Sequence, residues 1–426
     1  MYNLCIFEDT KYRNFLPLTH LRPVYDLMCG LDTILGKIIR IVPHENVILH
    51  SREHLEDLLK LNHINALINR FTTAGSCLFI NGRCLFNQNL LQQVELKEGR
   101  NYLYLNEQEE VVMAYLNGEN LVTMKDLLTR GPVNLAEIYQ TFRLKATVKK
   151  IKVTLVNYPW DLIRCHKPQL QDDFDLIPRG ILKGEIHPQA VIINEGNIFI
   201  DKGAKIEAFS VLDATEGPIY ISKDVHVHPH SYLKGPLFLG DNTQILGAKV
   251  SSSSLGPFCK IGGEVTSSTI LGYTNKAHDG FLGNAYLGEW INLGAMTTNS
   301  NLKNNYKPIN VVIDGSSVAT NESFFGCIIA DHTKTGIGTL LNTSIVIGIA
   351  NNLYGGGFFS QKVIPSFVWG TQQQMVEHKI EKMLETADAV MKRRSQDLTD
   401  AHKKTLKDVY ERTQNERFHF IKAYCS

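Results

Sequence analysis

Aliphatic residues six positions apart recur through the middle of the chain, and Gly, Asp or Ser directly follows the first residue of each pair. The clearest segments are Ile200–Ile206, Ile221–Val227, Leu239–Ile245, Leu255–Ile261 and Leu287–Leu293. The dipeptide Leu-Gly also starts at positions 239, 255, 271 and 287, an interval of 16 residues each time. Repetition at a short, fixed period is typical of a solenoid, whose repeats pack only on their neighbours.

The six-residue spacing has a direct structural meaning. Six residues hold one short strand and one turn, so three such sides form a triangular coil whose aliphatic residues point inward. Gly, Asp and Asn supply the turn conformations between the sides. We therefore expect a parallel β-helix over residues 180–370. The polar segment Asn299–Pro308 lacks the repeat and is predicted to be a loop that projects from a coil, a natural wall for a ligand groove.

Residues 1–157 have a different pattern, in which short β-rich runs alternate with amphipathic stretches. Strands are expected at Leu4–Phe7, Asn46–His50, Ile64–Ile68 and Cys77–Ile80, with a hairpin at Tyr102–Leu116. Helices are expected at Val24–Ile41, at His54–Leu61 and over residues 116–150. This alternation predicts an α/β domain with an open, partly parallel sheet. Residues 158–179 are predicted to be a linker with a helix at Trp160–Leu170, entered through Pro159.

Residues 371–426 are expected to be helical. Apolar residues at 3.6-residue spacing form one stripe, with mixed charges opposite. They are Val376, Ile380, Met383, Leu384, Ala387, Val390 and Met391. The stripe is expected to pack on the β-helix or on a neighbouring subunit; the alternative is a membrane-surface helix.

Composition narrows the function classes. The chain has 426 residues with 44 Lys and Arg against 43 Asp and Glu, a net charge of +1, which argues against a nucleic-acid binder. Its eight cysteines form no Cys-x-x-Cys pair, so reduced thiols are expected. Neither a signal-peptide core nor a membrane-spanning apolar run is visible, and we expect a cytoplasmic protein without membrane contact.

Histidines at alternate positions, His226, His228 and His230, lie on one face of a predicted strand. Zinc binding is one interpretation. Solvated side chains are the simpler one, because the spacing does not match that of the β-helix zinc enzymes.

The densest polar stretch, residues 275–305, resembles a known family. The segments Lys276-Ala277, His278, Phe281–Gly283, Ile291–Thr297 and the loop around Asn301 are similar to the acetyltransferase half of the bifunctional enzymes that make UDP-N-acetylglucosamine. A divergent branch with a His-Asp-Gly-Phe motif, here 278–281, resembles the chain more closely still. The resemblance extends over nearly the full length. It implies a left-handed β-helix of the hexapeptide acyltransferase kind and a homotrimer.

The resemblance also implies roles for individual residues. His278 would be the general base that deprotonates the amine of a glucosamine 1-phosphate-type substrate before attack on acetyl-CoA, a task that suits imidazole. Glu264 would orient the imidazole. The backbone around Gly294 and Ala295 would line the acetyl-CoA groove. The expected substrate-binding residues are Asn292 and Asn301 for the sugar, with Lys276 and Lys303 for its phosphate.

Three departures from the family pattern lie in the same stretch. One residue is missing between Lys276-Ala277 and His278, Leu302 stands where the family has Tyr, and an upstream phosphate-binding Arg has no counterpart around Gly262 and Gly263. These changes concern the acceptor more than the reaction.

Near the N-terminus, Phe15–Pro23 resembles the Leu-x-Pro-Leu-Thr segment of sugar-1-phosphate nucleotidyltransferases. By that resemblance, Thr19 and Arg22 would lie near the nucleotide phosphates. The family's glycine-rich phosphate loop is absent, because residues 7–13 contain no glycine. The Gly-Asp that holds Mg²⁺ in the family reads Gly82-Arg83 here. Asp9 is the candidate Mg²⁺ ligand, required only if this domain is active.

Three functions stay open from the sequence. The first is N-acetyl transfer from acetyl-CoA to an amino-sugar phosphate on the β-helix, with nucleotidyl transfer to a sugar 1-phosphate, of the UDP-N-acetylglucosamine type, left open for the N-terminal domain. The second is nucleotidyl transfer alone, as in glucose-1-phosphate thymidylyltransferase-like proteins. The third is a non-catalytic subunit that binds sugar nucleotides.

Overall fold

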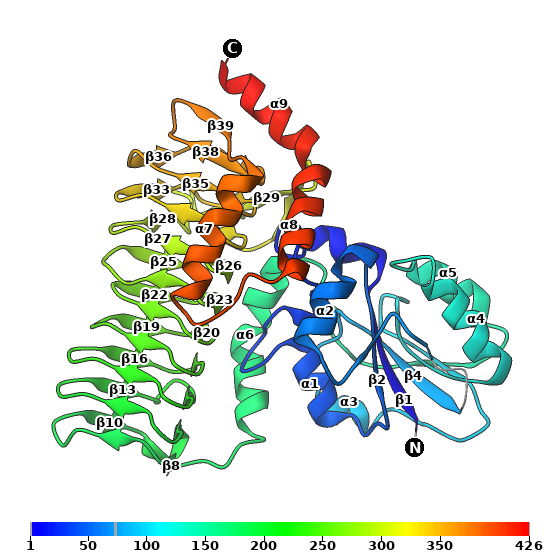
Figure 1. The fold of residues 1–426 in the computed structure, drawn as a ribbon. Helices are drawn as coiled ribbons and strands as arrows, with labels where there is room; N and C mark the ends of the chain where they lie inside the picture. Colours follow the sequence, from blue (N-terminus) through cyan, green and yellow to red (C-terminus); the bar gives the residue numbers. More distant parts are fainter. Residues whose placement is uncertain (1, 72–74, 426) are drawn as a thin grey trace. The chain divides into compact units, whose positions relative to one another are not determined.

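A computed structural model describes residues 2–71 and 75–425, and the chain forms two compact units (Figure 1). Unit 1 comprises Met1–Leu27 and Asp32–Tyr158. Unit 2 comprises Met28–Leu31 and Pro159–Ser426. The short segment Met28–Leu31 belongs to unit 2 because its backbone is bonded there: the carbonyl of Met28 accepts from the hydroxyl of Tyr286 at 3.0 Å.

Unit 1 is built on one mixed sheet in the order β3-β2-β1-β4-β6-β5-β7. The first four strands in the chain run parallel, β6 is antiparallel to β4 and β5, and β7 is parallel to β5. This confirms the predicted open, partly parallel sheet. The strands are β1 (Asn3–Phe7), β2 (Val47–His50), β3 (Leu67–Ile68), β4 (Ser76–Asn81), β5 (Tyr102–Leu105), β6 (Val111–Asn117) and β7 (Thr147–Lys150).

The helices of unit 1 are shorter than expected. The predicted helix Val24–Ile41 is interrupted, because Gly30 takes a positive φ of 89° and Thr33 caps a new helix through the amide of Gly36. The region 116–150 also ends in the strand β7 rather than in helix. The helices are η1 (Thr10–Phe15), η2 (Val24–Asp26), α1 (Ile34–Ile41), η3 (Glu53–Leu55), α2 (Glu56–Asn62), α3 (Gln88–Leu91), α4 (Gly118–Leu128) and α5 (Leu135–Phe142).

The core of unit 1 explains why these elements pack. Apolar residues of α4 and α5, among them Met124 and Phe142, are fully buried in one cluster with Cys5, Phe79 and Ala114 of the central strands. Each helix therefore contributes one apolar stripe to one face of the sheet.

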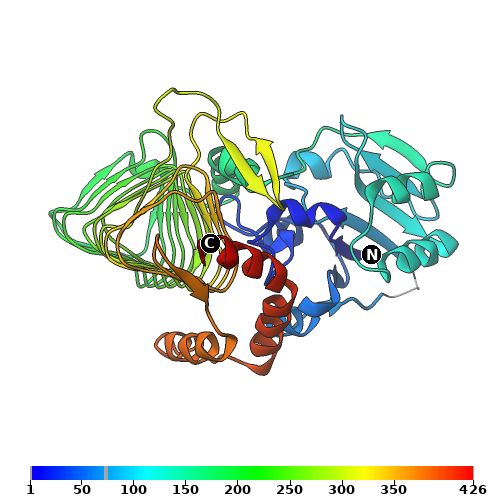
Figure 2. The same cartoon turned by 90° about the horizontal axis from the view of Figure 1, so that it is seen from above.

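Unit 2 begins with α6 (Pro159–Phe174) and continues as a stack of coils, seen end-on as a triangular outline in Figure 2. All strands along the stack pair in parallel except at its C-terminal end, which confirms the predicted parallel β-helix. The first face consists of β8 (Ile181–Leu182), β11 (Ile198–Ile200), β14 (Ile219–Ile221), β17 (Leu237–Leu239), β20 (Ser254–Leu255), β23 (Thr269–Gly272), β26 (Tyr286–Glu289), β31 (Cys327–Ile329), β34 (Ile345–Ile347) and β37 (Val363–Ile364).

The second and third faces complete each coil. The second face consists of β9 (Glu185–Ile186), β12 (Lys205–Ile206), β15 (His226–Val227), β18 (Gln244–Ile245), β21 (Lys260–Ile261), β24 (Asn275–Lys276), β27 (Asn292–Leu293), β32 (Lys334–Thr335), β35 (Asn352–Leu353), β38 (Val368–Gly370) and the antiparallel β39 (Met375–Glu377). The third face consists of β10 (Val191–Ile193), β13 (Val211–Asp213), β16 (Tyr232–Lys234), β19 (Lys249–Ser251), β22 (Glu264–Thr266) and β25 (Phe281–Gly283), followed by β28 (Thr298–Asn299), β33 (Thr339–Leu341) and β36 (Gly357–Phe359). A short η4 (Glu195–Asn197) precedes β11.

The predicted inward aliphatic positions are confirmed, since both residues of all five six-residue pairs lie in one core cluster at 0–2% exposure. The 16-residue interval holds from Leu239 to Leu255 and is wrong for the next two coils. Leu255 pairs with Ile270 and Ile270 with Leu287, so these coils measure 15 and 17 residues and Leu271 lies one place out of the column. Uneven side lengths are tolerated because strand pairing, not spacing, sets the register.

A segment of about residues 300–326 leaves the stack after β28, as the loop prediction required. It carries the antiparallel hairpin β29 (Asn310–Ile313) and β30 (Ser316–Ala319), which projects beside the coils in Figure 2.

The C-terminal helices are α7 (Ile380–Lys392), α8 (Asp400–Arg412) and α9 (Gln414–Cys425). The predicted helical stripe starts at Ile380, not at Val376, which lies 47% exposed on β39. Figures 1 and 2 show α7 alongside the coils of the β-helix. Phe420 and Tyr424 of α9 pack against the β-helix core, so this helix covers apolar side chains that the solenoid would otherwise expose. Within the described residues, every helix is too short or too polar to cross a membrane.

Candidate functional sites

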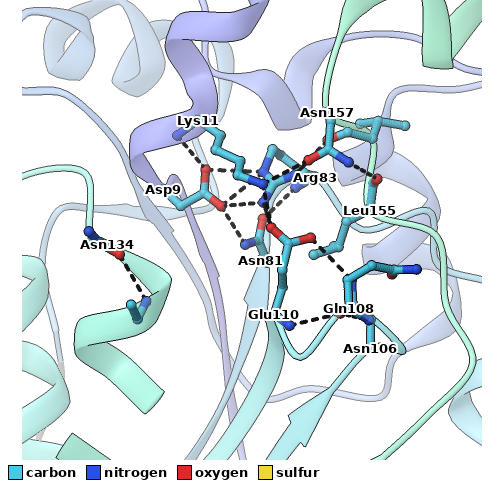
Figure 3. Close-up of polar contacts among 12 residues, drawn as sticks. Asp9, Lys11, Asn81, Arg83, Asn106, Gln108, Glu110, Asn134, Leu155 and Asn157 are labelled. Atoms are coloured by element: carbon cyan, nitrogen blue, oxygen red, sulfur yellow. Dashed lines mark hydrogen bonds and ion pairs between the residues drawn. The ribbon is translucent and has the colours of Figure 1, made fainter. Parts of the chain in front are cut away.

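Unit 1 has a buried charged centre where β1 and β4 end (Figure 3). Asp9 follows β1, and Asn81 and Arg83 lie at and just after the end of β4. The guanidinium of Arg83 grips the Asp9 carboxylate through Nε at 2.9 Å and Nη2 at 2.8 Å. The amide of Asn81 donates to the same carboxylate at 2.8 Å. Asp9 and Arg83 are each 1% exposed, so the ion pair is shielded from water.

A second set of groups surrounds this ion pair. The Nη1 of Arg83 donates to the side-chain oxygen of Asn157 and to the carbonyl of Val156, both at 2.8 Å. Lys11 bonds Glu110 at 2.5 Å, and Glu110 lies 3.7 Å from Arg83. Burial raises the pKa of Glu110, but the bond from Lys11 and the charge of Arg83 outweigh it and hold the pKa below its usual value. Two cations therefore balance two carboxylates.

The chain after β1 forms the short helix η1 instead of a phosphate-binding loop. Its first backbone N–H groups already have acceptors: Thr10 donates to the carbonyl of Val133, Lys11 to the Asp9 carboxylate, and Tyr12 to the Asp9 carbonyl. A phosphate cradle needs such N–H groups to point at the ligand. None of these three donors is free for that role.

Thr19 and the backbone of Arg22 make structural contacts within unit 1. Thr19 is fully buried and its hydroxyl donates to the carbonyl of Tyr12 at 3.1 Å, so it braces the turn from inside. The carbonyl of Arg22 accepts from Arg52 at 2.9 Å. Arg52, absent from the sequence prediction, also pairs with the buried Glu8 at 2.9 Å and stacks on the ring of Tyr12. The structure thus shows structural contacts for Thr19 and the Arg22 backbone.

The predicted Mg²⁺ ligand Asp9 does not fit the family's metal. One carboxylate oxygen of Asp9 accepts from the Lys11 backbone and Arg83, and the other accepts from Asn81 and Arg83. No lone pair of this carboxylate therefore faces an open position. Among the described residues, no group of three or more His, Cys, Asp or Glu side chains is arranged to hold a metal ion. The zinc alternative therefore finds no support either; His226 bonds Glu207 and stacks on His228.

Two of the predicted acetyl-transfer residues, His278 and Glu264, lie at a corner of the β-helix between its second and third faces. His278 lies in the turn between β24 and β25, and its side chain is exposed. Glu264 lies on the coil below, at the start of β22, where its backbone N–H donates to the carbonyl of Gly280 at 3.1 Å. Within the described part of the chain, the side chains of His278 and Glu264 form no hydrogen bond with each other. Both are open to a ligand at the same corner.

Lys276 has a structural role that the sequence prediction did not anticipate. It occupies an inward position, paired with Ile261, and is 1% exposed. Its ammonium donates to the carbonyls of Gly262, His278 and Gly280 at 2.7, 3.1 and 2.9 Å. Burial lowers the pKa of Lys276 to about 8, against the opposing effect of nearby carboxylates. This geometry argues against the predicted contact with a substrate phosphate.

The next coils continue the corner with an apolar edge. The backbone of Met296 donates to the carbonyl of Asp279 at 2.7 Å, and Ala295 accepts from Gly338 at 2.8 Å, so the coils are in direct register. Met296, Ile337 and Tyr354 are 55%, 75% and 46% exposed. We call these three residues the apolar edge.

Gly294, predicted to line the acetyl-CoA groove with Ala295, is required by packing. A Cβ at Gly294 would lie 2.6 Å from the carbonyl carbon of Gly336 on the next coil. Ala295, one residue further on, is half-buried and adjoins the apolar edge.

Asn292 and Asn301 are not neighbours within one chain. Asn292 lies on the second face, where it accepts a bond from Asn275 at 2.8 Å. Asn301 lies at the far end of β25 from His278, since its amide donates to Asn284, the residue directly after that strand, at 2.9 Å. Lys303 bonds the carbonyl of Pro308 within the projecting segment. The three residues thus come from separate parts of the surface.

Phe281 is a candidate contact that the sequence prediction missed. It is half-buried and lies on β25, in register with Glu264 on the coil below. Its place in the strand, three residues after His278, was the available signal, because alternate strand positions point outward. The third face therefore presents Phe281 between the His278 corner and Asn301.

A cavity of about 480 Å³ lies elsewhere in unit 2, between α6 and residues 321–325. Arg164, which lines the cavity, pairs with Asp161 at 2.6 Å and faces Glu322 at 3.7 Å. The cavity is lined by Asn284 but not by His278, so it is separate from the candidate acetyl-transfer corner.

Fold and sites together define an α/β nucleotidyltransferase-like unit followed by a β-helix unit. Residues 4–181 match the family model described as sugar nucleotidyl transferase. A bifunctional protein GlmU from Methanococcus aeolicus is 25% identical over 88% of this chain and 98% of its own length. A bifunctional sugar-1-phosphate nucleotidylyltransferase/acetyltransferase from Sulfurisphaera tokodaii is 24% identical over 58% of each chain.

One solved structure, from Bacillus anthracis and assigned as a glucose-1-phosphate thymidylyltransferase, aligns with 40% of this chain and 95% of its own at 11% identity and a TM-score of 0.30. That similarity is too low to carry an argument. The full-length sequence match and the family model agree with the predicted resemblance. Residues 4–181 thus resemble sugar nucleotidyl transferases, and the chain is similar to a GlmU protein over most of its length.

Proposed function

We propose that unit 2 transfers an acetyl group from acetyl-CoA to the amine of an amino-sugar phosphate, of the glucosamine 1-phosphate type. The observation that carries this proposal is the exposed His278 at a rigid corner of the β-helix, with Glu264 on one side and the apolar edge on the other. The names of the relatives, which include an acetyltransferase, support it.

The chemistry assigned to His278 is general base catalysis. Its imidazole takes a proton from the neutral substrate amine as the amine nitrogen attacks the thioester carbonyl carbon. A C–N bond forms, the C–S bond breaks, and the imidazolium returns the proton to the departing thiolate of coenzyme A. Glu264 is proposed to orient the imidazole, in contact with it once substrate is bound.

The two substrates are proposed to approach the corner from different sides. The apolar edge offers Met296, Ile337 and Tyr354 to the pantetheine arm of acetyl-CoA, with the backbone at Ala295 beside it. Strand β25 lies between His278 and Asn301, and a three-residue strand spans roughly 10 Å. The sugar is proposed to lie over Phe281 on this strand, between the two residues. Asn292 and Lys303 are proposed as further sugar or phosphate contacts, reached with a neighbouring subunit in a homotrimer.

The test is direct acetylation. Purified protein is incubated with acetyl-CoA and a panel of amino-sugar phosphates, and free thiol and product mass are recorded. An acetylated sugar phosphate from any member supports the proposal. Thiol release without such a product, or no turnover with the whole panel, contradicts it and leaves unit 2 as a structural or sugar-nucleotide-binding element.

Nucleotidyl transfer to a sugar 1-phosphate is the second candidate function, and the family match over residues 4–181 favours it. Its test is pyrophosphate release from each nucleoside triphosphate with common sugar 1-phosphates. No release with any combination would assign unit 1 to binding alone. We also propose that the protein acts in the cytoplasm.

A further inference from the structure

The charged centre of unit 1 carries an inference that the family relationship does not. In the family resemblance, position 83 holds an acidic metal ligand after the glycine; here it is Arg83. Gly82 is retained, because a Cβ there would lie 2.7 Å from the ring of Tyr25. The local backbone is thus preserved while the charge at the next residue is inverted.

Arg83 is held at this position by contacts on all sides. Nε and Nη2 bond Asp9, and Nη1 bonds Asn157 and the carbonyl of Val156. Its backbone N–H donates to the side chain of Asn81 at 2.9 Å. Removal of this buried guanidinium would strongly destabilise unit 1, because the buried Asp9 carboxylate would lose its counter-charge.

The carboxylates that would attract a cation are already neutralised. Asp9 faces Arg83, and Glu110 faces both Lys11 and Arg83. Hard cations such as Mg²⁺ need carboxylate oxygens that are free to coordinate and a net negative site. This centre offers neither.

We infer that the guanidinium of Arg83 takes the place of the divalent cation, so that the centre between Asp9 and residue 83 binds no metal ion. Any ligand that unit 1 accepts is then bound without Mg²⁺ at this position. Lys11, which pairs with Glu110 at this centre, has a side chain that is 43% exposed.

The test uses the full chain and Mn²⁺ as the probe, with two readouts that need no activity. Mn²⁺ binding is followed by electron paramagnetic resonance, and thermal unfolding is followed with Mn²⁺ or with a chelator. We expect the wild type to melt at the same temperature in both. In Arg83→Asp, three carboxylates (residues 9, 83 and 110) would meet with only Lys11 to balance them, so we expect a lower melting temperature that Mn²⁺ raises, with one ion bound per chain.

Arg83→Met is the matched control, since it removes the guanidinium without adding a ligand and should regain less stability with Mn²⁺. Asp9→Asn, made with Arg83 intact, shows whether any Mn²⁺ bound by the wild type depends on Asp9. This comparison tests the inference even if Arg83→Asp does not fold. Wild-type binding of one Mn²⁺ that is lost in Asp9→Asn overturns the inference. Binding that persists in Asp9→Asn lies elsewhere and agrees with it.

Discussion

The ammonium nitrogen of Lys276 lies 3.1 Å from the backbone carbonyl oxygen of His278. Lysine in the interior of a solenoid is costly unless its charge is bonded. Here the three carbonyls that it bonds belong to the turn that presents His278 and to the coil below. Lys276 is therefore a positioning residue that fixes the His278 turn from inside the coil.

Lys276→Met should keep the fold but weaken it. The substitution preserves the length of the side chain and leaves three carbonyls without their donor, which costs about 1–3 kcal/mol. We expect a lower free energy of unfolding and a lower kcat for acetyl transfer with a nearly unchanged KM. Lys260→Met, at an outward position on β21, is the control. Equal effects of the two substitutions would contradict the positioning role.

The pH dependence of stability should differ between the wild type and Lys276→Met. The pKa of Lys276 is lowered to about 8 in the folded chain, from 10.5. Between these values the unfolded chain binds the proton more tightly, so the stability of the wild type should rise with pH relative to the variant, by up to about 3 kcal/mol. Denaturant unfolding at a pH below 8 and at one near 10 measures it. Parallel pH profiles would mean that the carbonyls keep the ammonium protonated.

Gly294→Ala should destabilise the β-helix. The new Cβ would lie within 2.6 Å of the carbonyl carbon of Gly336, and overpacking of this kind costs about 1–3 kcal/mol. Gly196→Ala is the matched control, because no atom lies within 4 Å of a Cβ there. Thermal unfolding compares the two. A Gly294→Ala variant with wild-type stability and impaired acetyl-CoA binding would show that Gly294 serves the ligand directly.

The homotrimer is tested by mass. Met296, Ile337 and Tyr354 are exposed side by side on one corner, and closed symmetry would place the same surface of each subunit in an equivalent contact. Light scattering at micromolar concentration should give three chains per particle. The mass of a single chain would leave the proposed acetyl-CoA groove without a second wall.

The β-helix could be predicted because its signal is repeated many times. Each inward aliphatic residue is weak evidence by itself, but both members of the pairs from Ile200 to Leu293 lie in one core. The predicted 16-residue interval fails at Leu271, because the Leu-Gly dipeptide does not mark the inward position there. Ile270 fills that position, and Leu271 is buried beside it. Spacing alone cannot reveal a coil of 15 residues followed by one of 17.

The charged residues could not be placed from the sequence, because their partners are far away in the chain. Asp9 has the chemistry of a cation ligand, but its carboxylate is bonded by Arg83, which lies 74 residues later in the chain. The sequence alone does not show that contact. Lys276 was predicted to contact the sugar phosphate, but it occupies an inward position that aliphatic residues normally fill. His278 differs from both, since its exposure follows from its place in a turn, which the six-residue repeat already predicts.

The most direct test of the account is the rate of acetyl transfer by His278→Ala. Circular dichroism and thermal unfolding first establish that the variant folds, with His230→Ala, an exposed histidine three coils earlier, as the control. Loss of a general base lowers the rate by about 10² to 10⁴, so we expect that fall for His278→Ala, near-normal rates for His230→Ala, and retained acetyl-CoA binding in both. A folded His278→Ala variant that keeps more than about a tenth of the wild-type rate would contradict the account, as would a variant that cannot fold, which would make His278 a structural residue.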